Sequence, residues 1–278
     1  VNRRDGKSGE RKACRCMDVP DPQPFSHPPG NVTLSPMTVQ QPVGLFITGT
    51  DTEVGKTVVT AQIATALHAA GKKVGVYKPV ASGCRRQGDR LIADDALAIW
   101  EAAGKPRSLD DVCPQCFEAP LAPPLAAEQQ GDRVDPELLR RGICCWQESS
   151  DIVLVEGSGG LLSPVSEEDF VADLAIEFGY PLLIVVPNQL GAVNQALQTL
   201  VTATTFREGL VVAGLILNQR DEGGEDLSRA SNSGLLQQHA IPPLLAELPF
   251  RGTLPPSIDW MALAARPMDN PPAGDVLQ

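Results

Sequence analysis

Residues 53–57, with the sequence Glu-Val-Gly-Lys-Thr, combine residue types that suit the binding of a phosphate chain. They follow an apolar run at 43–47 and precede apolar residues with helical spacing, so we expect a strand, a tight turn and a helix. The first residues of a helix present unpaired N–H groups and the positive end of the helix dipole, and both attract phosphate. In such a loop the lysine, here Lys56, reaches the β- and γ-phosphates, and the hydroxyl of Thr57 holds Mg²⁺. The sequence therefore predicts a site for ATP or GTP.

The loop departs from the general phosphate-loop pattern at one position. The pattern G-x-x-x-x-G-K-[ST] requires glycine at position 50, where this chain has Thr50, with Gly49 one residue earlier. The strand, the turn and the helix still follow one another in the required order. The context therefore supports a nucleotide site despite the imperfect match.

A second candidate group is an acid at the end of a buried strand. The strand at 151–156 finishes with Glu156 and is followed by Gly-Ser-Gly-Gly at 157–160. In phosphate-loop enzymes an acid at this place faces the nucleotide-bound metal ion. The glycines would let the backbone approach a substrate or a phosphate. Glu156 is therefore a candidate metal ligand. The alternative is a structural role, in which Glu156 ends the strand and caps the following turn.

Three further polar side chains do not reveal their role by pattern alone. Lys78 ends a short strand at 74–78, Ser82 precedes a glycine, and Asp95 lies near the start of a predicted helix. A strand-end lysine is usually solvated, a serine before glycine often belongs to a turn, and acids at a helix N-terminus complement its dipole. For these residues the spacing leaves a functional and a structural role open.

The elements that must position these residues alternate between strands and helices. Strands are predicted at 43–48, 74–78, 151–156, 181–186, 210–218 and 243–249. Helices are predicted at 56–70, 91–103, 136–147, 170–178, 192–208 and 226–239, and the proline-rich tract 105–134 is predicted to be a loop. This alternation indicates an α/β fold: a single doubly wound, mainly parallel sheet with helices on both faces, like that of phosphate-loop NTPases. Ligands bind at the carboxyl ends of the strands in such sheets, where the candidate residues lie.

Composition limits the partners of this chain. The net charge of −11 and the isoelectric point near 4.8 argue against nucleic acid or an anionic membrane as the main partner. No apolar run reaches the roughly 18 residues that cross a bilayer. Seven cysteines, an odd number with two adjacent, do not resemble a secreted disulfide framework and favour a cytoplasmic location. Cys113 and Cys116 have the spacing of half a zinc site, but no second pair fits it, so we interpret the thiols as incidental.

Residues 1–41 differ from the rest of the chain. They are rich in proline and arginine, show no hydrophobic periodicity and lack the apolar core of a secretory signal. We interpret them as a disordered or non-native extension, with Met37 as the natural start. Residues 42–278 show no repeat and no second core, and we expect them to form one domain.

Five short segments occur together in the order found in a known family. They are 49–57 (Gly-Thr-Asp-Thr-Glu-Val-Gly-Lys-Thr), 77–83 (Tyr-Lys-Pro-Val-Ala-Ser-Gly), 95–98 (Asp-Ala-Leu-Ala), 155–160 (Val-Glu-Gly-Ser-Gly-Gly) and 190–194 (Leu-Gly-Ala-Val-Asn). From about residue 44 to residue 249 the chain resembles dethiobiotin synthetase, an enzyme of biotin biosynthesis, and the first two segments together are the specific part. Ser158 stands where the family commonly has alanine, a small-for-small change that we expect to be tolerated.

The resemblance implies an ATP- and Mg²⁺-dependent cyclo-ligase. It would convert 7,8-diaminononanoate and CO₂ to dethiobiotin through a carbamate and a carbamic–phosphoric anhydride, releasing ADP and phosphate. Lys56 and Lys78 would be the catalytic lysines, and the enzyme would be a homodimer. The metal ligands would be Thr57, Asp95 and Glu156. The nucleotide would contact Glu53, Val54, Gly55, Lys56, Thr57, Val58, Asp95, Glu156, Gly157, Ser158, Gly159, Asn218, Leu248, Pro249 and Phe250. The substrate would contact Thr52, Ser82, Leu190, Gly191 and Asn194.

Other classes share this kind of loop. Partitioning or septum-positioning ATPases carry an additional lysine five residues before the loop lysine, where this chain has Asp51. Related ATP-dependent amide-forming or cobyrinate-type synthetases, and regulators derived from this family, need not keep the segment 78–83. A nucleotide-binding module without chemistry is a third alternative, although every position that the reaction requires is filled.

Overall fold

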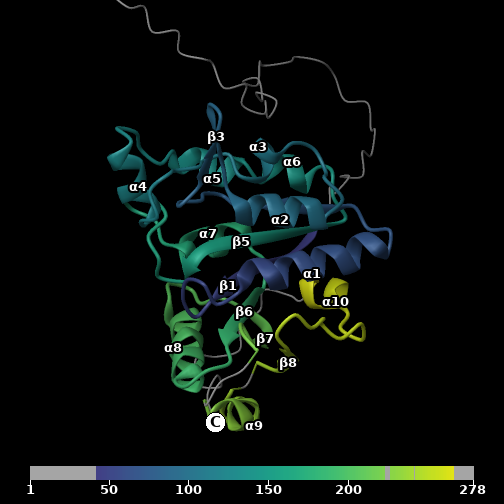
Figure 1. The fold of residues 1–278 in the computed structure, drawn as a ribbon. Helices are drawn as coiled ribbons and strands as arrows, with labels where there is room; N and C mark the ends of the chain where they lie inside the picture. The colour runs from purple at the N-terminus through teal and green to yellow at the C-terminus, as the bar shows by residue number, and fades with distance from the viewer. Residues whose placement is uncertain (1–41, 223–225, 241, 266–278) are drawn as a thin grey trace, which may run out of the picture. The chain divides into compact units, whose positions relative to one another are not determined.

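The structure, a computed structural model of the chain, describes residues 42–222, 226–240 and 242–265 (Figure 1). The chain divides into two units, Val1–Gln40 and Gln41–Gln278, and all elements below belong to the second. The interpretation of residues 1–41 as an extension lies outside the described residues.

A six-stranded parallel sheet forms the centre of this unit. Its strands are β1 (Val43–Gly49), β2 (Val74–Tyr77), β5 (Ile152–Gly160), β6 (Leu182–Pro187), β7 (Val212–Asn218) and β8 (Leu244–Leu248). They lie in the order β2-β5-β1-β6-β7-β8, and every neighbouring pair is parallel. β1, β2, β5, β6 and β7 are almost wholly buried, which explains why they appear in the sequence as largely apolar runs, whereas the edge strand β8 is only partly buried. The predicted α/β fold is confirmed.

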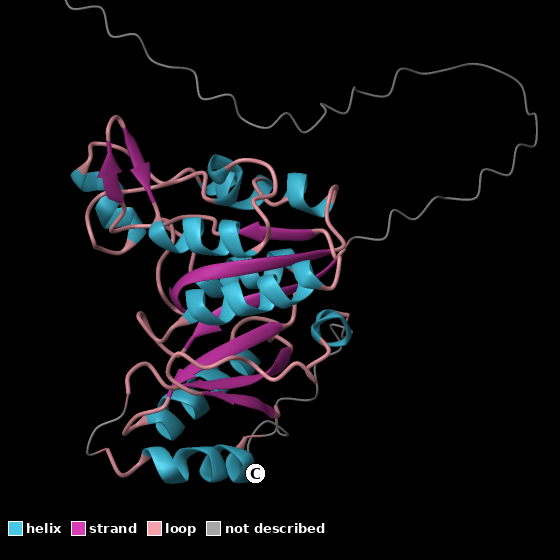
Figure 2. Ribbon diagram, turned by 45° about the vertical axis from the view of Figure 1, so that its right-hand side comes forward, coloured by secondary structure: helices cyan, strands magenta, loops and turns pink. Residues whose placement is uncertain are grey.

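The helices cover both faces of the sheet (Figure 2). They are α1 (Lys56–Ala69), α2 (Asp94–Ala102), α3 (Leu109–Val112), α4 (Pro123–Gln129), α5 (Pro136–Arg141), α6 (Cys144–Gln147), α7 (Val171–Phe178), α8 (Ala192–Thr205), α9 (Arg229–His239) and α10 (Trp260–Ala264). The connection from β1 to β2 runs one way along the sheet, whereas β5, β6, β7 and β8 follow one another in the opposite direction. Because parallel crossovers are right-handed, α1 covers one face and α7, α8 and α9 cover the other.

The predicted helix at 91–103 begins later than expected. Residues 85–92 form a small antiparallel hairpin of β3 (Arg85–Gln87) and β4 (Arg90–Ile92), and α2 starts only at Asp94. Gly88 adopts a left-handed backbone at the turn, with φ of 60°. Arg85 pairs with Asp94 at 2.6 Å, so that the hairpin is held to the start of the helix. Helical spacing alone did not separate these strands from α2.

The proline-rich tract is not a continuous loop, because it contains α3 and α4. Ser108 forms a capping box with Asp111 at the start of α3, and Pro123 and Pro124 occupy the first turn of α4. Proline is tolerated there because those N–H groups have no partner inside the helix. The prediction of loop throughout 105–134 is therefore wrong.

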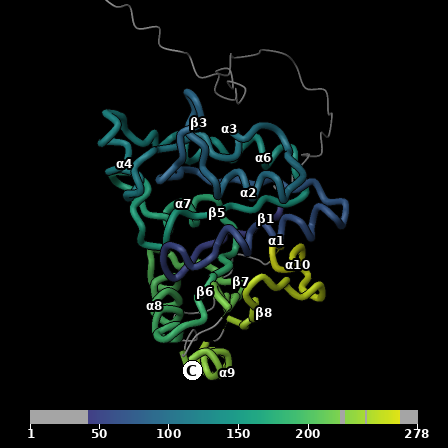
Figure 3. Tube along the Cα trace, in the orientation of Figure 1, coloured from purple at the N-terminus to yellow at the C-terminus, as the bar shows by residue number. Residues whose placement is uncertain are grey.

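The predicted helix at 136–147 is interrupted, and a further helix was missed. A Cβ atom at Gly142 would lie 2.3 Å from the hydroxyl of Tyr77, so the glycine lets this segment approach β2 between α5 and α6. The missed helix, α10, lies beside α1 although the two are far apart in sequence (Figure 3). Within the described ranges, no helix combines the length and the apolar character needed to cross a membrane.

Candidate active site

The phosphate loop connects β1 to α1 and is held by a strand-end amide. Gly55 has φ of 93°, and a Cβ atom there would lie 2.1 Å from Nδ2 of Asn218. That amide donates a hydrogen bond to the carbonyl oxygen of Val54 at 2.8 Å. Gly55 is therefore required for two reasons, a left-handed backbone and the close approach of Asn218.

Gly49 explains the departure from the general phosphate-loop pattern. A Cβ atom at Gly49 would lie 2.4 Å from the side chain of Val54 and 3.3 Å from Nζ of Lys56. The backbone N–H of Thr50 instead bonds to Val185 of β6 at 3.1 Å. In this chain the loop folds closely over position 49, so that this position needs the glycine and position 50 can carry a threonine.

A charged cluster lies beside the phosphate loop. Nζ of Lys78 donates to Oε1 of Glu156 at 2.6 Å and to Oδ2 of Asp95 at 2.9 Å. The hydroxyl of Thr57 donates to the same Glu156 oxygen at 3.0 Å. Lys78 is 3% exposed and Glu156 is fully buried. The structure therefore brings together four of the five charged or metal-binding candidates of the sequence, and the fifth, Lys56, precedes Thr57 directly on the phosphate loop.

Strand order creates this cluster. β5 lies between β1 and β2, so Glu156 in β5 lies next to the loop after β1 and next to Lys78 after β2. The backbone of residues 78–84 is also paired with residues 112–119, for example from the N–H of Lys78 to the oxygen of Val112 at 2.8 Å. The tract after α2 thus supports the segment that carries Lys78 and Ser82.

The pKa values of the charged groups follow from burial and pairing. Burial alone would lower the pKa of Lys78, but the nearby Glu156 and Asp95 carboxylates outweigh it and raise that pKa above its usual value. Burial favours a higher pKa for Asp95, but Lys78 lowers it overall. Burial, together with the charge of Lys78, lowers the pKa of Lys56 to about 8. The site therefore holds Lys78 firmly protonated and leaves Lys56 short of anionic partners, which a phosphate would supply.

The side chains at this place fit a magnesium ion. Oε2 of Glu156 is buried and has no hydrogen-bond partner among the described residues, and such an orphaned oxygen suits a cation. Thr57 and Asp95 lie beside the same carboxylate network. The part of the chain that the structure describes contains no group of three His, Cys, Asp or Glu side chains arranged around a metal. Mg²⁺ needs only one or two carboxylates, because waters and phosphate oxygens complete its shell.

The expected base contacts lie at the ends of β7 and β8, the last two strands on one side of the sheet. The N–H of Gln219 donates to the oxygen of Leu248 at 2.9 Å, so the end of β8 lies beside Asn218 at the end of β7. Leu248 is buried, whereas Pro249 is exposed and Phe250 half-buried. The structure therefore brings these expected contacts to the same edge as the phosphate loop.

The expected substrate contacts are more widely distributed. Thr52 is exposed on the phosphate loop, and Ser82 is half-buried after β2. Leu190, Gly191 and Asn194 are exposed at the start of α8. In the described residues these three form no hydrogen bond or ion pair with the charged cluster, so the single chain does not bring them into it.

The glycine-rich end of β5 also braces the Lys78 segment. β5 extends through residues 157–160, further than predicted. The hydroxyl of Ser158 donates to the oxygen of Val80 at 2.5 Å, and the N–H of Gly160 donates to Ser163 at 3.0 Å. Gly159 has φ of 92° and lies against Ser163. Serine at 158 therefore fits the site and adds a hydrogen bond that alanine would lack.

Sequence reasoning missed Arg220. Its guanidinium group donates to the backbone oxygen of Glu53 at 3.0 Å and to the side chain of Gln189 at 2.5 Å. Glu53 has φ of 55°, a strained value for a residue with a side chain, and Arg220 holds its peptide in place. The available signal was a basic residue two positions after Asn218 at a strand end.

Comparison with known proteins gives first the class and then the family. A family model described as an AAA domain matches residues 43–257. This match, the parallel sheet and the loop around Lys56 define a phosphate-loop NTPase. The chain is also similar to curated proteins named ATP-dependent dethiobiotin synthetase BioD. That of Rhodopirellula baltica is 41% identical over 208 residues, covering 71% of this chain and 80% of the relative.

Relatives from other bacteria that carry the same kind of name are also similar to this chain. The protein of that name from Thermodesulfovibrio yellowstonii is 34% identical, with 74% of this chain and 88% of the relative covered. BioD 1 of Escherichia coli is 34% identical, with 74% and 89% covered. The chain belongs to the dethiobiotin synthetase family of ATP-dependent ligases, as the five sequence segments indicated. Membership of this family decides against the partitioning-type ATPases.

Proposed function

We propose that this chain catalyses the ATP- and Mg²⁺-dependent carboxylation and ring closure of 7,8-diaminononanoate with CO₂. The products are dethiobiotin, ADP and phosphate. The observation that supports this reaction best is the buried Lys78 ammonium group, which lies beside the phosphate loop and contacts both Glu156 and Asp95. The reaction needs position and positive charge and requires no nucleophile from the protein, in keeping with this site.

The reaction proceeds in three steps. One substrate amine captures CO₂ as a carbamate. An oxygen of the carbamate attacks the γ-phosphoryl group of ATP and displaces ADP, which forms a carbamic–phosphoric anhydride. The second amine then attacks the carbonyl carbon, displaces phosphate and closes the ureido ring.

The phosphate loop binds and orients the nucleotide. The backbone of Glu53–Val58 surrounds the phosphates, and Lys56 pairs with the β- and γ-phosphates. Because the pKa of Lys56 is lowered to about 8 by burial and by Lys78, an arriving anion favours its charged form. Asn218, Leu248, Pro249 and Phe250 contact the adenine on the neighbouring strands, and Gly157, Ser158 and Gly159 let the β5 backbone approach the nucleotide.

Thr57, Asp95 and Glu156 hold the magnesium ion. When bound, the ion offsets the charge of the phosphate oxygens. The unpartnered Oε2 of Glu156 supports this assignment. Lys78 already contacts both carboxylates, so its ammonium group lies where the charge of the carbamate and of the transferring phosphoryl group would develop.

The diamine is bound by two subunits. Thr52 and Ser82 contact the substrate and its carbamate, whereas Leu190, Gly191 and Asn194 meet the carboxylate of the diamine across the interface of a homodimer. The exposure of Leu190, which is 79%, supports an interface at this place. We also propose a cytoplasmic location, in keeping with Cys84, Cys113 and Cys116, which form no disulfide within the described residues.

A direct assay tests the proposal. The purified chain is incubated with MgATP, bicarbonate and 7,8-diaminononanoate, and ADP and dethiobiotin are measured together. We expect diamine-dependent release of ADP with one dethiobiotin per ADP. The variant Lys78→Ala should lose this activity, whereas Lys72→Ala, which removes an exposed lysine, should retain it. ADP release that is independent of the diamine would exclude the proposed reaction.

A further inference from the structure

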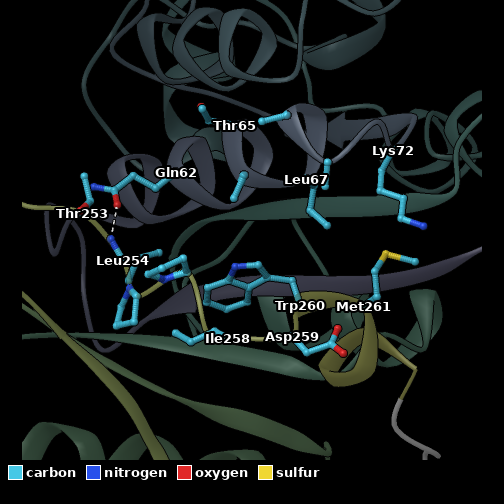
Figure 4. A pocket seen from close by; sticks show the side chains of 15 residues that line it. Gln62, Thr65, Leu67, Lys72, Thr253, Leu254, Ile258, Asp259, Trp260 and Met261 are labelled. Atoms are coloured by element: carbon cyan, nitrogen blue, oxygen red, sulfur yellow. Dashed lines mark hydrogen bonds between the residues drawn. The ribbon is translucent and has the colours of Figure 1, made fainter.

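Gln62 connects the phosphate-loop helix to the segment that follows β8. Gln62 lies on α1, about 1.7 turns after Lys56. Nε2 donates to the oxygen of Gly252 at 3.0 Å, and Oε1 accepts from the N–H of Leu254 at 2.7 Å. Figure 4 shows the second of these bonds. One side chain therefore satisfies two backbone groups of the loop, as a neighbouring strand would do.

The loop reached by Gln62 is a tight structure. The N–H of Gly252 bonds to the oxygen of Pro249 at 2.8 Å, and Arg251 has φ of 55°. The Arg251 guanidinium group lies 4.9 Å from the centre of the Phe250 ring. The loop thus forms one turn, in which a hydrogen bond joins Gly252 to Pro249.

An apolar groove also lies between this loop and α1. A largely apolar groove of about 580 Å³ lies between α1 and residues 253–261, with Gln62 at one end and Trp260 at its centre (Figure 4). Among the described residues, Gln62 is the α1 side chain that hydrogen-bonds to residues 249–256. Through this amide, α1 therefore fixes two backbone groups of the loop.

We infer that Gln62 is a positioning residue that sets the separation between the base-binding loop and the phosphate loop. The inference rests on the proposed function in one respect, the placement of adenine along residues 248–250. Lys56 and Gln62 are about 9 Å apart along the helix axis, at about 1.5 Å per residue. The phosphate loop would hold the phosphates of a nucleotide, and the loop bound by Gln62 would hold its base. The affinity for a nucleotide therefore depends on the spacing between these two loops. Inorganic tripolyphosphate, which has no base, does not depend on it.

The test compares ATP with inorganic tripolyphosphate. Both ligands are titrated, with Mg²⁺, against the wild-type chain, Gln62→Met and Gln62→Ala. Methionine keeps the length and the apolar stem of the side chain, so the protein should fold even if the alanine variant does not. We expect ATP affinity to fall about 10-fold, as for the loss of two ordinary hydrogen bonds, and tripolyphosphate affinity to change less than about 2-fold. KM for ATP should rise with kcat nearly unchanged, and the preference for ATP over GTP should decrease.

Thr65→Ala is the matched control, because Thr65 lies on the same helix and groove but is exposed. It should leave both affinities unchanged. Equal losses of ATP and tripolyphosphate affinity, or an unchanged ATP affinity, would overturn the inference. A wild-type chain that binds ATP but forms no dethiobiotin would instead refute the proposed reaction, and the ligand comparison would still decide the role of Gln62.

Discussion

Lys78 is the side chain on which the proposed chemistry depends most. A buried ammonium group is costly unless it is paired, and here Glu156 and Asp95 both accept its hydrogen bonds. The same pairing keeps it protonated and directs it to the phosphate loop. Because the two carboxylates raise the pKa of Lys78 despite its burial, this lysine stays protonated at neutral pH and supplies positive charge.

Replacing Lys78 with alanine should reduce turnover by roughly 10²–10³-fold, because a charge that stabilises the transition state is lost. It should also destabilise the fold by roughly 3–5 kcal/mol, because Glu156 then stays buried without its partner. Turnover of folded protein and chemical denaturation measure the two effects. The Lys72→Ala variant should match the wild type in both. Normal turnover of folded Lys78→Ala would exclude the role assigned to Lys78.

The carboxylates give a prediction about the metal. Asp95→Asn and Glu156→Gln should each raise the Mg²⁺ concentration for half-maximal activity by about 10-fold or more, as expected when a group at a metal site is lost. The matched control is Asp94→Asn, which changes the neighbouring exposed acid that pairs with Arg85. It should leave the Mg²⁺ requirement unchanged. If both active-site variants also left it unchanged, the ligands would have to lie elsewhere.

At the scale of elements, the phosphate loop depends on the contact between β7 and the start of α1. Gly55→Ala should abolish ATP binding, because the new Cβ atom would displace the Asn218 amide and the backbone would be strained by about 1–3 kcal/mol. Gly71→Ala is a close match, with a similar φ of 77° but open space around the new atom. It should lower stability slightly and leave ATP binding intact. Isothermal titration calorimetry with ATP distinguishes the two glycine variants. Equal ATP affinities of the two variants would contradict the proposed fit of Gly55 against Asn218.

The ion pair between Arg140 of α5 and Asp169, two residues before α7, affects the stability of the domain. Arg140 bonds to Asp169 at 2.7 Å, and this hydrogen bond, assisted by one from Ser166, holds the pKa of Asp169 below its usual value although burial opposes the shift. A depressed carboxyl pKa stabilises the fold above the unfolded value near 3.8 and loses that contribution as pH falls through the lower folded value. Asp169→Asn should therefore cost about 1–2 kcal/mol at neutral pH, and less below about pH 4. Denaturation at several pH values tests this. Asp110→Asn, which removes one partner of an exposed pair with Arg90, is the control and should change the free energy of unfolding at neutral pH by less than about 0.5 kcal/mol.

At the scale of the molecule, Leu190 tests the proposed dimer. It is 79% exposed, and its N–H bonds to Asp226 beside the 90% exposed Leu227. Leu190→Glu should shift the sedimenting species from dimer to monomer and raise KM for the diamine at least about 10-fold, while ATP binding persists. The control Leu125→Glu, at an exposed leucine on α4, should remain dimeric. A wild-type chain that sediments as a monomer would contradict the dimer.

Much of the fold was predictable because its signals are local. The strands are short apolar runs, and most of the long helices follow the helical period, so their existence depended on neighbouring residues alone. The break at Gly142 was missed because it depends on Tyr77, a partner distant in sequence, and the β3–β4 hairpin likewise depends in part on the distant Glu118, which pairs with Arg86. The helices of the proline-rich tract were missed because proline breaks a helix only beyond its first turn.

By itself, the sequence determined the nucleotide loop, the acid at 156 and, through its five segments, the family, because these depend on residue types at fixed spacing. Only the tertiary structure decided whether Lys78 is a solvated lysine or a buried partner of Glu156. Placing β5 between β1 and β2 joins residues 78 and 156 at one edge of the sheet, and burial there makes their pairing obligatory. The structure likewise gave Gly49, Asn218 and Gln62 their roles, because each depends on an atom contributed by a distant segment.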